Sequence, residues 1–472
     1  MSDLTVMGWL YWAYCIVAIL LLVKVVLNNR DTFKTLAWIM VLVFLPGLGM
    51  VLYFFFGRDT RKNRLISKRQ LSQIQQRNQL QNSADALPDI PQEYSSLASF
   101  FDNVSSSRPL CASGAEIIDS TERFASLLLE QVAAAKEHIH MQFYIFENDE
   151  FGRTLRDALV AKAKEGVEVR VIYDSVGCLA VDKGFFEGMR CAGIYVESFM
   201  KVRFPLFTRR VNYRNHRKVV VIDGNVGFVG GCNIADRYLK GINGGVWRDT
   251  MMLLRGAAVH GLQSAFLQDW YFANRTLVSG KRYFPLQPGG DVAVQTVLSN
   301  PVGNVRTIMN GMLKAIHSAR RCVYLQSPYF MPNEAFVTAL KCAALSGVDV
   351  RLMIPMRSDS RVADYASRSY LSPLLDAGVK VYLYKDGFLH SKTMMCDERL
   401  SSIGSVNLDF RSFYYNFEIS AFVYGKSVAQ ELKSQFMRDA GHCHQLAQNE
   451  FRARPFVKRC AESVVRLFSP LL

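Results

Sequence analysis

Uncharged, mostly apolar residues form two long runs at the start of the chain. The first extends from Thr5 to Val23, and the second from Thr35 to Gly57. Because a membrane-spanning helix needs about twenty such residues, the pattern predicts two transmembrane helices in an anchor of residues 1–57. A cleaved signal peptide is the alternative for the first run, although no basic residue precedes it. Pro46 and two glycines interrupt the second run, which leaves a kink or a re-entrant hairpin open.

Basic residues cluster directly after the second run, from Arg58 to Arg69. Because positively charged flanks stay on the cytoplasmic side of a membrane, the cluster predicts that the rest of the chain is cytoplasmic. The next stretch, to about Pro109, is rich in Gln, Asn and Ser. This composition indicates that residues 58–111 are a basic and then polar connector between the anchor and the first domain.

Beyond the connector, short apolar runs alternate with helical patterns, and the order occurs twice. Apolar strands begin near His140 and Gly166 in one half, and near Tyr324 and Gly347 in the other. A helical pattern separates the strands of each pair. The order predicts two α/β/α halves with mixed sheets, residues 112–290 and 291–472, around a pseudo-twofold axis.

The last residues, Phe456 to Leu472, mix three basic side chains with several large apolar ones. Such a segment forms an amphipathic helix that lies on a membrane, or a helix that docks on its own domain. The sequence leaves both interpretations open.

The chain has a formal net charge of +15, which favours anionic partners such as phosphates, phospholipid headgroups or nucleic acid. Its ten cysteines are scattered without a C-x-x-C pair. This usage is typical of reduced thiols in a cytosolic setting, so we expect neither disulfides nor a zinc site.

One motif, with the spacing H-x-K-x4-D, occurs twice. The first copy begins at His216 and the second at His390, 174 positions later. Six identities at one constant offset make an internal duplication far more plausible than coincidence. The pairs are His216 and His390, Lys218 and Lys392, Asp223 and Asp397, Gly230 and Gly404, Asn233 and Asn407, and Arg237 and Arg411.

The repeated motif contains the groups that phosphodiester chemistry needs. One unprotonated imidazole attacks phosphorus and forms a phosphohistidine, while the other, protonated, donates to the departing alkoxide. An imidazole pKa near neutrality makes both states available. The paired lysines (Lys218, Lys392) and asparagines (Asn233, Asn407) supply charge and hydrogen bonds to the phosphoryl oxygens. We therefore predict one site shared by the halves, without a metal or other cofactor.

Strand alternation divides the signature residues. His216 and Lys218 project from one face of a strand, whereas Asp223 has the opposite parity, and the second copy behaves alike. Asp223 and Asp397 belong to the catalytic signature, but we expect them to hold a turn or the seam between the halves.

Each imidazole also needs an acceptor on its second nitrogen. One acid stands in the strand-like stretch after each motif, Asp249 in the first half and Glu418 in the second. These two acids are the predicted orienting partners of the histidines.

The paired H-x-K-x4-D motif with G-[GS]-x-N resembles the phospholipase D superfamily. The layout of the whole chain is similar to that of bacterial cardiolipin synthases, including the segments Leu45–Gly49, Asn407–Arg411 and Asn416–Glu418. The resemblance implies an enzyme of the bacterial inner membrane that converts two phosphatidylglycerol molecules into cardiolipin and glycerol through a phosphohistidine.

The family also implies roles for single residues. His216 matches the nucleophile and His390 the acid and base, although the residues alone do not decide between them. Ser405 matches a phosphate-binding serine, whereas Gly231 replaces that serine in the first half. The basic and aromatic segment from Lys201 to Arg210 suits an anionic lipid headgroup, or is an ordinary basic loop.

Several alternatives share these motifs. A membrane phospholipase D that hydrolyses lipids to phosphatidic acid has the same signature, and so has a synthase that uses phosphatidylethanolamine as donor. A nuclease of the superfamily also needs basic charge, but two membrane spans argue against nucleic acid as the partner. A scaffold that only binds anionic lipid does not need both His and Lys pairs. The sequence leaves a homo-oligomer open.

Overall fold

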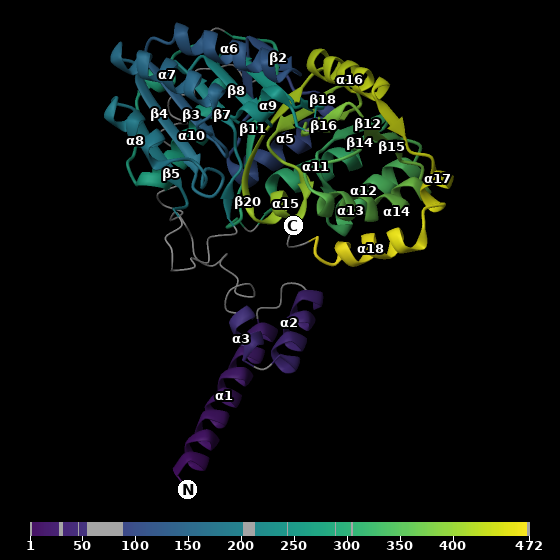
Figure 1. Cartoon of the computed structure of the whole chain (residues 1–472). Coiled ribbons are helices and arrows are strands. Elements are labelled where there is room, and N and C mark those ends of the chain that lie inside the picture. The colour runs from purple at the N-terminus through teal and green to yellow at the C-terminus, as the bar shows by residue number, and fades with distance from the viewer. Residues whose placement is uncertain are drawn as a thin grey trace. The chain divides into compact units, whose positions relative to one another are not determined.

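The computed structural model divides into two compact units, Met1–Arg64 and Leu65–Leu472, whose elements Figure 1 labels. The cluster from Arg58 to Arg69 lies outside the described residues, and so does nearly all of the segment from Lys201 to Arg210. The structure describes residues 2–27, 32–45, 47–53, 88–201, 213–242, 244–287, 289–303 and 305–469.

The first unit contains the helices α1 (Ser2–Leu27), α2 (Thr32–Phe44) and α3 (Leu48–Leu52). Between α2 and α3, Gly47 takes a left-handed φ of 80°, so the second apolar run is interrupted where its glycines stand. Among the residues described in this chain, no helix combines the length and the hydropathy that crossing a membrane requires.

The first half of the larger unit is built on a seven-stranded mixed sheet with the order β2-β10-β8-β7-β3-β4-β5. β3, β4 and β5 are parallel because helices connect them, and the other neighbours are antiparallel. The elements are β2 (Gly114–Ile118), α6 (Thr121–Ala134), β3 (His138–Phe143), α7 (Glu150–Lys164), β4 (Glu168–Asp174), α8 (Lys183–Cys191), β5 (Tyr195–Phe199), β6 (Arg214–Asn215), β7 (Val219–Ile222), β8 (Val226–Gly230), α9 (Asp236–Lys240), β9 (Val246–Arg248), β10 (Met251–Arg255) and α10 (Val259–Asn274).

The second half is built on a ten-stranded sheet with the order β1-β11-β20-β18-β17-β12-β14-β15-β21, to which β6 is added beside β20. Its elements are β11 (Val292–Ser299), α11 (Thr307–Ser318), β12 (Cys322–Gln326), β13 (Phe330–Met331), α12 (Glu334–Leu345), β14 (Asp349–Pro355), α13 (Arg361–Ser369), α14 (Leu371–Asp376), β15 (Lys380–Tyr384), β16 (Gly387–Leu389), β17 (Thr393–Cys396), β18 (Leu400–Gly404), β19 (Leu408–Asp409), α15 (Phe410–Tyr414), β20 (Asn416–Tyr424), α16 (Lys426–Gly441), β21 (Cys443–Gln445), α17 (Gln448–Arg452) and α18 (Phe456–Arg466).

The duplication predicted from the motif extends to the strands themselves. β7 and β17 begin and end at residues related by the motif's own offset, and so do β8 and β18. β7 with β8, and β17 with β18, forms the hairpin that follows each motif histidine, with the turn at the motif aspartate. The prediction of two duplicated α/β halves is therefore confirmed.

Three large hydrophobic cores fill the two halves and the space between their sheets. One lies between the first sheet and the helices α6, α7 and α8, and another between the second sheet and helices that include α11 and α12. A third core lies between the two sheets and contains side chains of α10 and α16. Because this third core draws side chains from both sheets, the halves form one body.

The predicted connector, residues 58–111, includes an ordered part of the second half. α5 (Gln92–Ser105) buries Tyr94, Leu97 and Phe101 in the core of the second half. β1 (Leu110–Ala112) then pairs with β11 in the second sheet. The polar composition of α5 hides this role, because its apolar face meets strands that are about 200 residues further along the chain.

Candidate active site

Each motif histidine follows a very short strand that pairs with the opposite half. β6 runs parallel to the start of β20, and the amide of His216 then donates to the carbonyl of Phe417 (2.9 Å). β16 runs parallel to β9, and the amide of His390 donates to the carbonyl of Arg248 (2.7 Å). The crossings are reciprocal, so each histidine lies beside the strand that leads to the acid of the other half.

The orienting acids are exchanged between the halves. His216 Nδ1 lies 3.1 Å from Glu418 Oε2, and His390 Nδ1 lies 2.6 Å from Asp249 Oδ2. The two acids are 0% and 1% exposed, respectively. A carboxylate beside Nδ1 favours the proton on that nitrogen and leaves Nε2 with its lone pair. Both acids predicted from the sequence thus contact a histidine, each from the opposite half.

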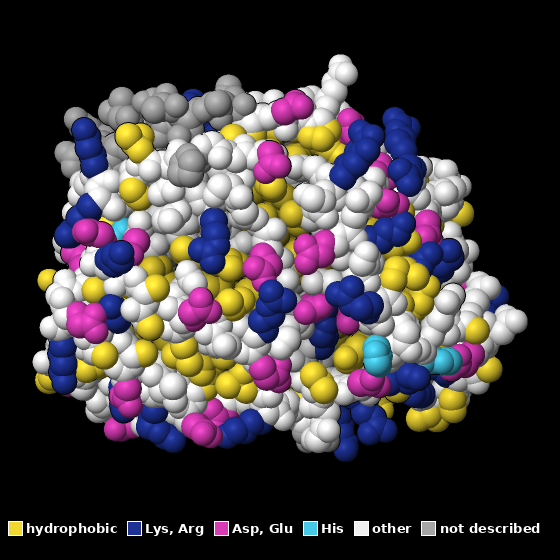
Figure 2. Space-filling model, turned by 90° about the horizontal axis from the view of Figure 1, so that it is seen from above, with side chains coloured by type: hydrophobic (Ala, Val, Ile, Leu, Met, Phe, Trp, Pro, Cys, Tyr) yellow, Lys and Arg dark blue, Asp and Glu magenta, His cyan; other side chains and the backbone are white. Residues whose placement is uncertain are grey.

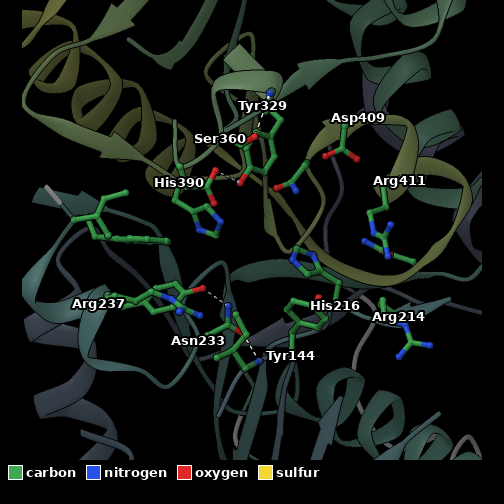
Figure 3. A pocket seen from close by; sticks show the side chains of 18 of the residues that line it. Tyr144, Arg214, His216, Asn233, Arg237, Tyr329, Ser360, His390, Asp409 and Arg411 are labelled. Atoms are coloured by element: carbon green, nitrogen blue, oxygen red, sulfur yellow. Dashed lines mark hydrogen bonds between the residues drawn. The ribbon is translucent and has the colours of Figure 1, made fainter. Parts of the chain in front are cut away.

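The two imidazoles face one cavity of about 580 Å³, within the range of small-molecule sites. Figure 3 shows His390 and His216 on opposite walls, with the space between them open. The walls are a mixture of aromatic, amide and charged side chains. They include Tyr144, Tyr238, Trp247, Tyr329, Asn233, Asn407, Arg214, Arg237, Arg411, Asp359, Ser360 and Asp409.

Aromatic rings pack against both imidazoles. The centroid of the Trp247 ring lies 4.9 Å from that of His390, and the Phe388 centroid lies 5.4 Å away. Tyr144 meets His216 edge-on at 5.2 Å. These rings place low-polarity surface beside both imidazoles, so charges that develop next to them are less screened than in water.

Burial governs the protonation of the site. It lowers the pKa of His390 to about 3, with help from the Lys392 ammonium and against the pull of Asp249. Burial also lowers the pKa of His216, which Glu418 opposes. Both imidazoles are therefore neutral at pH 7 in the ligand-free site.

The lysines respond in the same direction. Burial lowers the pKa of Lys218 to about 7 and holds that of Lys392 below its ordinary value. For the acids Asp249 and Glu418, burial raises the pKa, but the nearby histidine and lysine outweigh it and lower both. The cluster thus holds its two carboxylates ionised at neutral pH.

Lys218 and Lys392 lie against the backbone of the histidines. Lys218 Nζ donates to the carbonyl of His216 (2.6 Å). Lys392 Nζ donates to the carbonyl of His390 and lies 2.8 Å from its Nδ1. The sequence predicts direct contact with phosphoryl oxygens, whereas here both ammonium groups bind a histidine carbonyl and only Lys392 also contacts an imidazole nitrogen.

Asp223 and Asp397 lie at the far end of the motif strands, away from the cavity. Both take a left-handed φ, of 52° and 53°. Each carboxylate accepts hydrogen bonds of 2.7–2.9 Å from three successive backbone amides before or at the start of a central strand. Each aspartate thus holds a turn against the start of a central strand, and neither lines the cavity between the histidines. The amides are those of Lys136, Glu137 and His138, and of Arg320, Arg321 and Cys322.

The candidate phosphate-binding residues have different positions. Asn233 and Asn407 line the cavity. The amide of Asn233 is held by the protein, since it accepts from the Ile145 amide (3.0 Å) and donates to Tyr238 (2.5 Å). Asn407 Oδ1 has no hydrogen-bond partner among the described residues. This oxygen is a buried acceptor, so any contact of Asn407 with a phosphate goes through its NH₂ group, which hydrogen-bonds with Asp409.

Ser405 is fully buried behind His216 and does not reach the cavity wall in the described structure. Its hydroxyl donates to Glu418, and its carbonyl oxygen lies 3.1 Å from His216 Nδ1. Ser405 therefore contacts both Glu418 and His216, whereas the sequence predicts a contact with phosphate.

Gly231, the counterpart of Ser405, makes room for the acid of the first half. A Cβ atom on Gly231 would lie 2.0 Å from Asp249 Oδ1. A serine at position 231 would collide with Asp249 in its present position. This close approach explains why Gly231 replaces the serine of the family pattern.

Arg411 is the functional candidate that the sequence reasoning left without a role. It lines the cavity (Figure 3), and its guanidinium makes no ion pair with the described residues. Its first-half counterpart, Arg237, pairs with Glu147 (2.9 Å). The signal was present, because this pair is one of the six identities of the duplicated motif.

Comparisons with known proteins agree with this geometry. The family model described as "Cardiolipin synthase, PLD-like domain" matches residues 128–270 and 312–440, and "Phospholipase_D-nuclease N-terminal" matches residues 16–58. The chain is 40% identical over 475 residues to the major cardiolipin synthase ClsA of Bacillus subtilis (strain 168), covering 97% of this chain and 98% of that protein. It is 41% identical over 456 residues to a cardiolipin synthase of Geobacillus kaustophilus (strain HTA426), covering 94% and 90%.

A solved structure shares the fold. The phosphatidylserine synthase of Haemophilus influenzae Rd KW20 superposes with a TM-score of 0.62 at 16% identity, covering 80% of this chain and 98% of that one. At this identity the likeness concerns the fold alone.

Proposed function

The chain belongs to the cardiolipin synthase family with phospholipase-D-like domains, and on that premise we propose that it joins two phosphatidylglycerol molecules into cardiolipin and glycerol. As a member of this family it is an enzyme, a phosphatidyltransferase. The observation that carries the proposal is the pair of imidazoles, each held by a buried carboxylate of the opposite half, that face one cavity.

The first step transfers the phosphatidyl group to the protein. His216 Nε2 bonds to phosphorus, the bond from phosphorus to the headgroup glycerol oxygen breaks, and His390 donates its proton to that oxygen. In the second step His390 removes the proton from the glycerol hydroxyl of another phosphatidylglycerol. That oxygen then bonds to phosphorus as the bond to His216 breaks.

The surroundings of the two Nδ1 atoms support this division of roles. Both neighbours of His216 Nδ1, the Glu418 carboxylate and the Ser405 carbonyl, are acceptors, so the proton stays on Nδ1 and Nε2 is a nucleophile. His390 Nδ1 lies between an acceptor, Asp249, and a donor, Lys392. Because this environment favours neither protonation state of Nδ1 as strongly, it suits the imidazole that takes up and releases a proton.

Substrate charge completes the protonation of the acid. Both imidazoles have lowered pKa values in the ligand-free site. A phosphodiester carries one negative charge, and an opposite charge within a few ångströms raises the pKa of an imidazole. Binding of the lipid therefore favours the imidazolium that protonates the leaving glycerol.

The reaction brings two phosphates to one cavity, and we assign the second to Arg411. The phosphate under attack lies between the histidines, whereas the acceptor lipid carries its own phosphodiester. The guanidinium of Arg411 lines the same cavity and is not neutralised by an acid of the described chain. A guanidinium binds phosphate through two parallel hydrogen bonds, which would fix the acceptor hydroxyl near phosphorus.

We also propose that the enzyme acts at the bacterial inner membrane, with the catalytic unit in the cytoplasm. The two uncharged runs in residues 1–57 are the proposed anchor, and the basic cluster that follows is the expected cytoplasmic flank. The anchor keeps a soluble active site beside its lipid substrate.

Purified full-length protein tests the proposal with phosphatidylglycerol vesicles. We expect equimolar cardiolipin and glycerol, and retained activity with a chelator present. Phosphatidic acid as the main product would instead identify a phospholipase D. A requirement for phosphatidylethanolamine would identify the variant synthase.

Removal of either histidine tests the mechanism. His216→Ala and His390→Ala should each lower turnover by about 10³-fold or more, as expected for a nucleophile and its acid-base partner. His390→Ala keeps the nucleophile but lacks the acid of the first step and the base of the second, so denatured samples should carry a slowly formed phosphatidyl group on His216 whose phosphorus–nitrogen bond is acid-labile and base-stable. Phosphate on His390 in the His216→Ala variant would reverse the assigned roles.

A further inference from the structure

The C-terminal helix α18 turns its apolar face to solvent. Phe456, Val457 and Leu467 are 76–77% exposed, and Val464 and Phe468 are 57% and 52% exposed. These side chains recur at the spacing of one helix face, together with the exposed Cys460.

The opposite face of α18 is fixed on the protein. Glu462 is 2% exposed and pairs with Arg454 (2.5 Å). The Arg466 guanidinium lies 4.5 Å from the ring centroid of Tyr370. The helix is thus docked through this ion pair, the Arg466 contact and Val465, which packs against the core of the second half, whereas its larger apolar side chains face solvent.

The exposed charges of α18 have one sign. Lys458, Arg459 and Arg466 are its basic residues, and Glu462, its one acid, is buried and paired. Lys458 and Arg459 make no ion pair in the part of the chain that the structure describes. The face of the molecule in Figure 2 differs, because acidic and basic side chains are interspersed across it. An apolar stripe flanked by basic charge is typical of helices that lie in the interface of an anionic bilayer.

α18 is connected to the active site through α13. The two helices pack against each other beneath the second half (Figure 1). Ser360 and Ala363, at the start of α13, line the cavity between the histidines. Val362 and Tyr365 of the same helix are exposed by 45% and 36%. The apolar face of α18 therefore lies one helix away from the cavity wall.

We propose that α18 inserts its apolar face into the headgroup region of an anionic phospholipid bilayer and thereby holds the cavity at the membrane surface. Two copies of the chain that met through this face would bring their basic residues together, whereas anionic lipid complements them. The inference rests on the proposed function only for the identity of the substrate, since membrane contact by α18 is measured without turnover.

A fluorophore on Cys460 tests the contact directly. The full-length chain carries serine in place of its other accessible cysteines (Cys15, Cys191, Cys342 and Cys443), and an environment-sensitive probe is attached to Cys460. In vesicles that contain phosphatidylglycerol we expect a blue shift and quenching by a lipid-borne quencher. The matched control retains only the exposed Cys342, on α12, and its probe should stay in water.

Two probe results, and one crosslinking result, would overturn the inference. One is a Cys460 probe that stays in water with these vesicles. The other is a Cys460 probe that responds equally with uncharged phosphatidylcholine vesicles, because the basic residues then have no role. Efficient Cys460-to-Cys460 crosslinking between chains would identify a second copy as the occupant and would also reject the bilayer.

A pair of variants links the contact to activity. Val457→Ser with Leu467→Ser should lower turnover on vesicles by about tenfold and leave turnover in mixed detergent micelles unchanged. Leu345→Ser, at a residue of α12 that is 71% exposed, is the matched control and should change neither. Equal loss on vesicles and micelles would point to misfolding and against lipid contact. If the wild type makes no cardiolipin, the proposed function fails while the probe result stands.

Discussion

The histidine of the first half and that of the second half are held by acids of different length. His216 Nδ1 lies 3.1 Å from the carboxylate of Glu418, which also accepts a hydrogen bond from the Ser405 hydroxyl. His390 Nδ1 lies 2.6 Å from the carboxylate of Asp249, which has a shorter side chain. In the turn beside Asp249, Gly231 leaves no room for a side chain. A duplicated unit can therefore supply two unequal imidazoles. The side chain of the turn residue, absent at Gly231 and present at Ser405, limits how closely the acid can approach.

Neutralising the acids should have the largest effect on this comparison. We expect Asp249→Asn and Glu418→Gln to lower turnover by about 10²–10⁴-fold, since an amide no longer stabilises the imidazolium or its tautomer. Glu418→Gln should slow formation of the phosphohistidine, whereas Asp249→Asn should let it accumulate, which rapid-quench measurements would distinguish. Glu334→Gln, at a surface acid, is the control. Equal partition of the intermediate in both variants would contradict the two distinct roles.

Exchanging the turn residues should have a smaller and unequal effect. Gly231→Ser displaces Asp249, so we expect turnover to fall by about 10²-fold, because sub-ångström positioning of a catalytic group is lost. Ser405→Gly removes one hydrogen bond to Glu418 and should cost about tenfold. Gly188→Ser, where a new side chain meets open space, serves as the control in steady-state assays. A larger loss in Ser405→Gly than in Gly231→Ser would reverse the comparison.

Replacing either motif aspartate should have the same effect in both halves. It should lower stability and leave the catalytic step unchanged. Asp223→Asn and Asp397→Asn keep a residue that tolerates a left-handed φ but weaken three amide contacts. We expect each variant to lose about 1–3 kcal/mol of unfolding free energy in denaturant titrations, with activity per folded molecule nearly unchanged. Loss of activity at unchanged stability would return the aspartates to the catalytic group.

The smallest expected difference is in acid sensitivity. Burial lowers the pKa of His138 to about 4 and that of His140 to about 3 in β3. Cys322 and Tyr324 occupy the equivalent positions of β12. Below about pH 6.5 the two histidines bind protons in the unfolded chain but not in the native protein. Their contribution to the unfolding free energy is therefore fully present above about pH 6.5 and is lost as the pH falls toward 4.

Unfolding free energies measured at pH 7, 6 and 5 check this sign. His138→Cys, which introduces the residue of the second half, should flatten the decline below pH 6.5. An unchanged slope would show that the acid sensitivity arises elsewhere in the chain.

Local patterns predicted much of this molecule. The strands β7 and β17 and their hairpins follow from apolar runs closed by an Asp-centred turn. The packing of α5 in the second half was missed, because a short helix carries no sign of a partner about 200 residues away. In the site, strand parity separated Asp223 from His216, and the strand-like stretches pointed to Asp249 and Glu418. Which acid meets which histidine was beyond the sequence, because the pairing depends on how β6 and β16 cross between the halves.

The sequence by itself determined the duplication, the identity of the two histidines and the separation of His216 from Asp223, since spacing and side-chain alternation are properties of the chain alone. Only the tertiary structure decided that the acids are exchanged, that Ser405 lies behind His216 and that Arg411 enters the cavity. It also decided that α18 faces outward with its apolar side. These outcomes depend on contacts between segments that are far apart in the chain, and such contacts exist only after two half-sites have packed into one body.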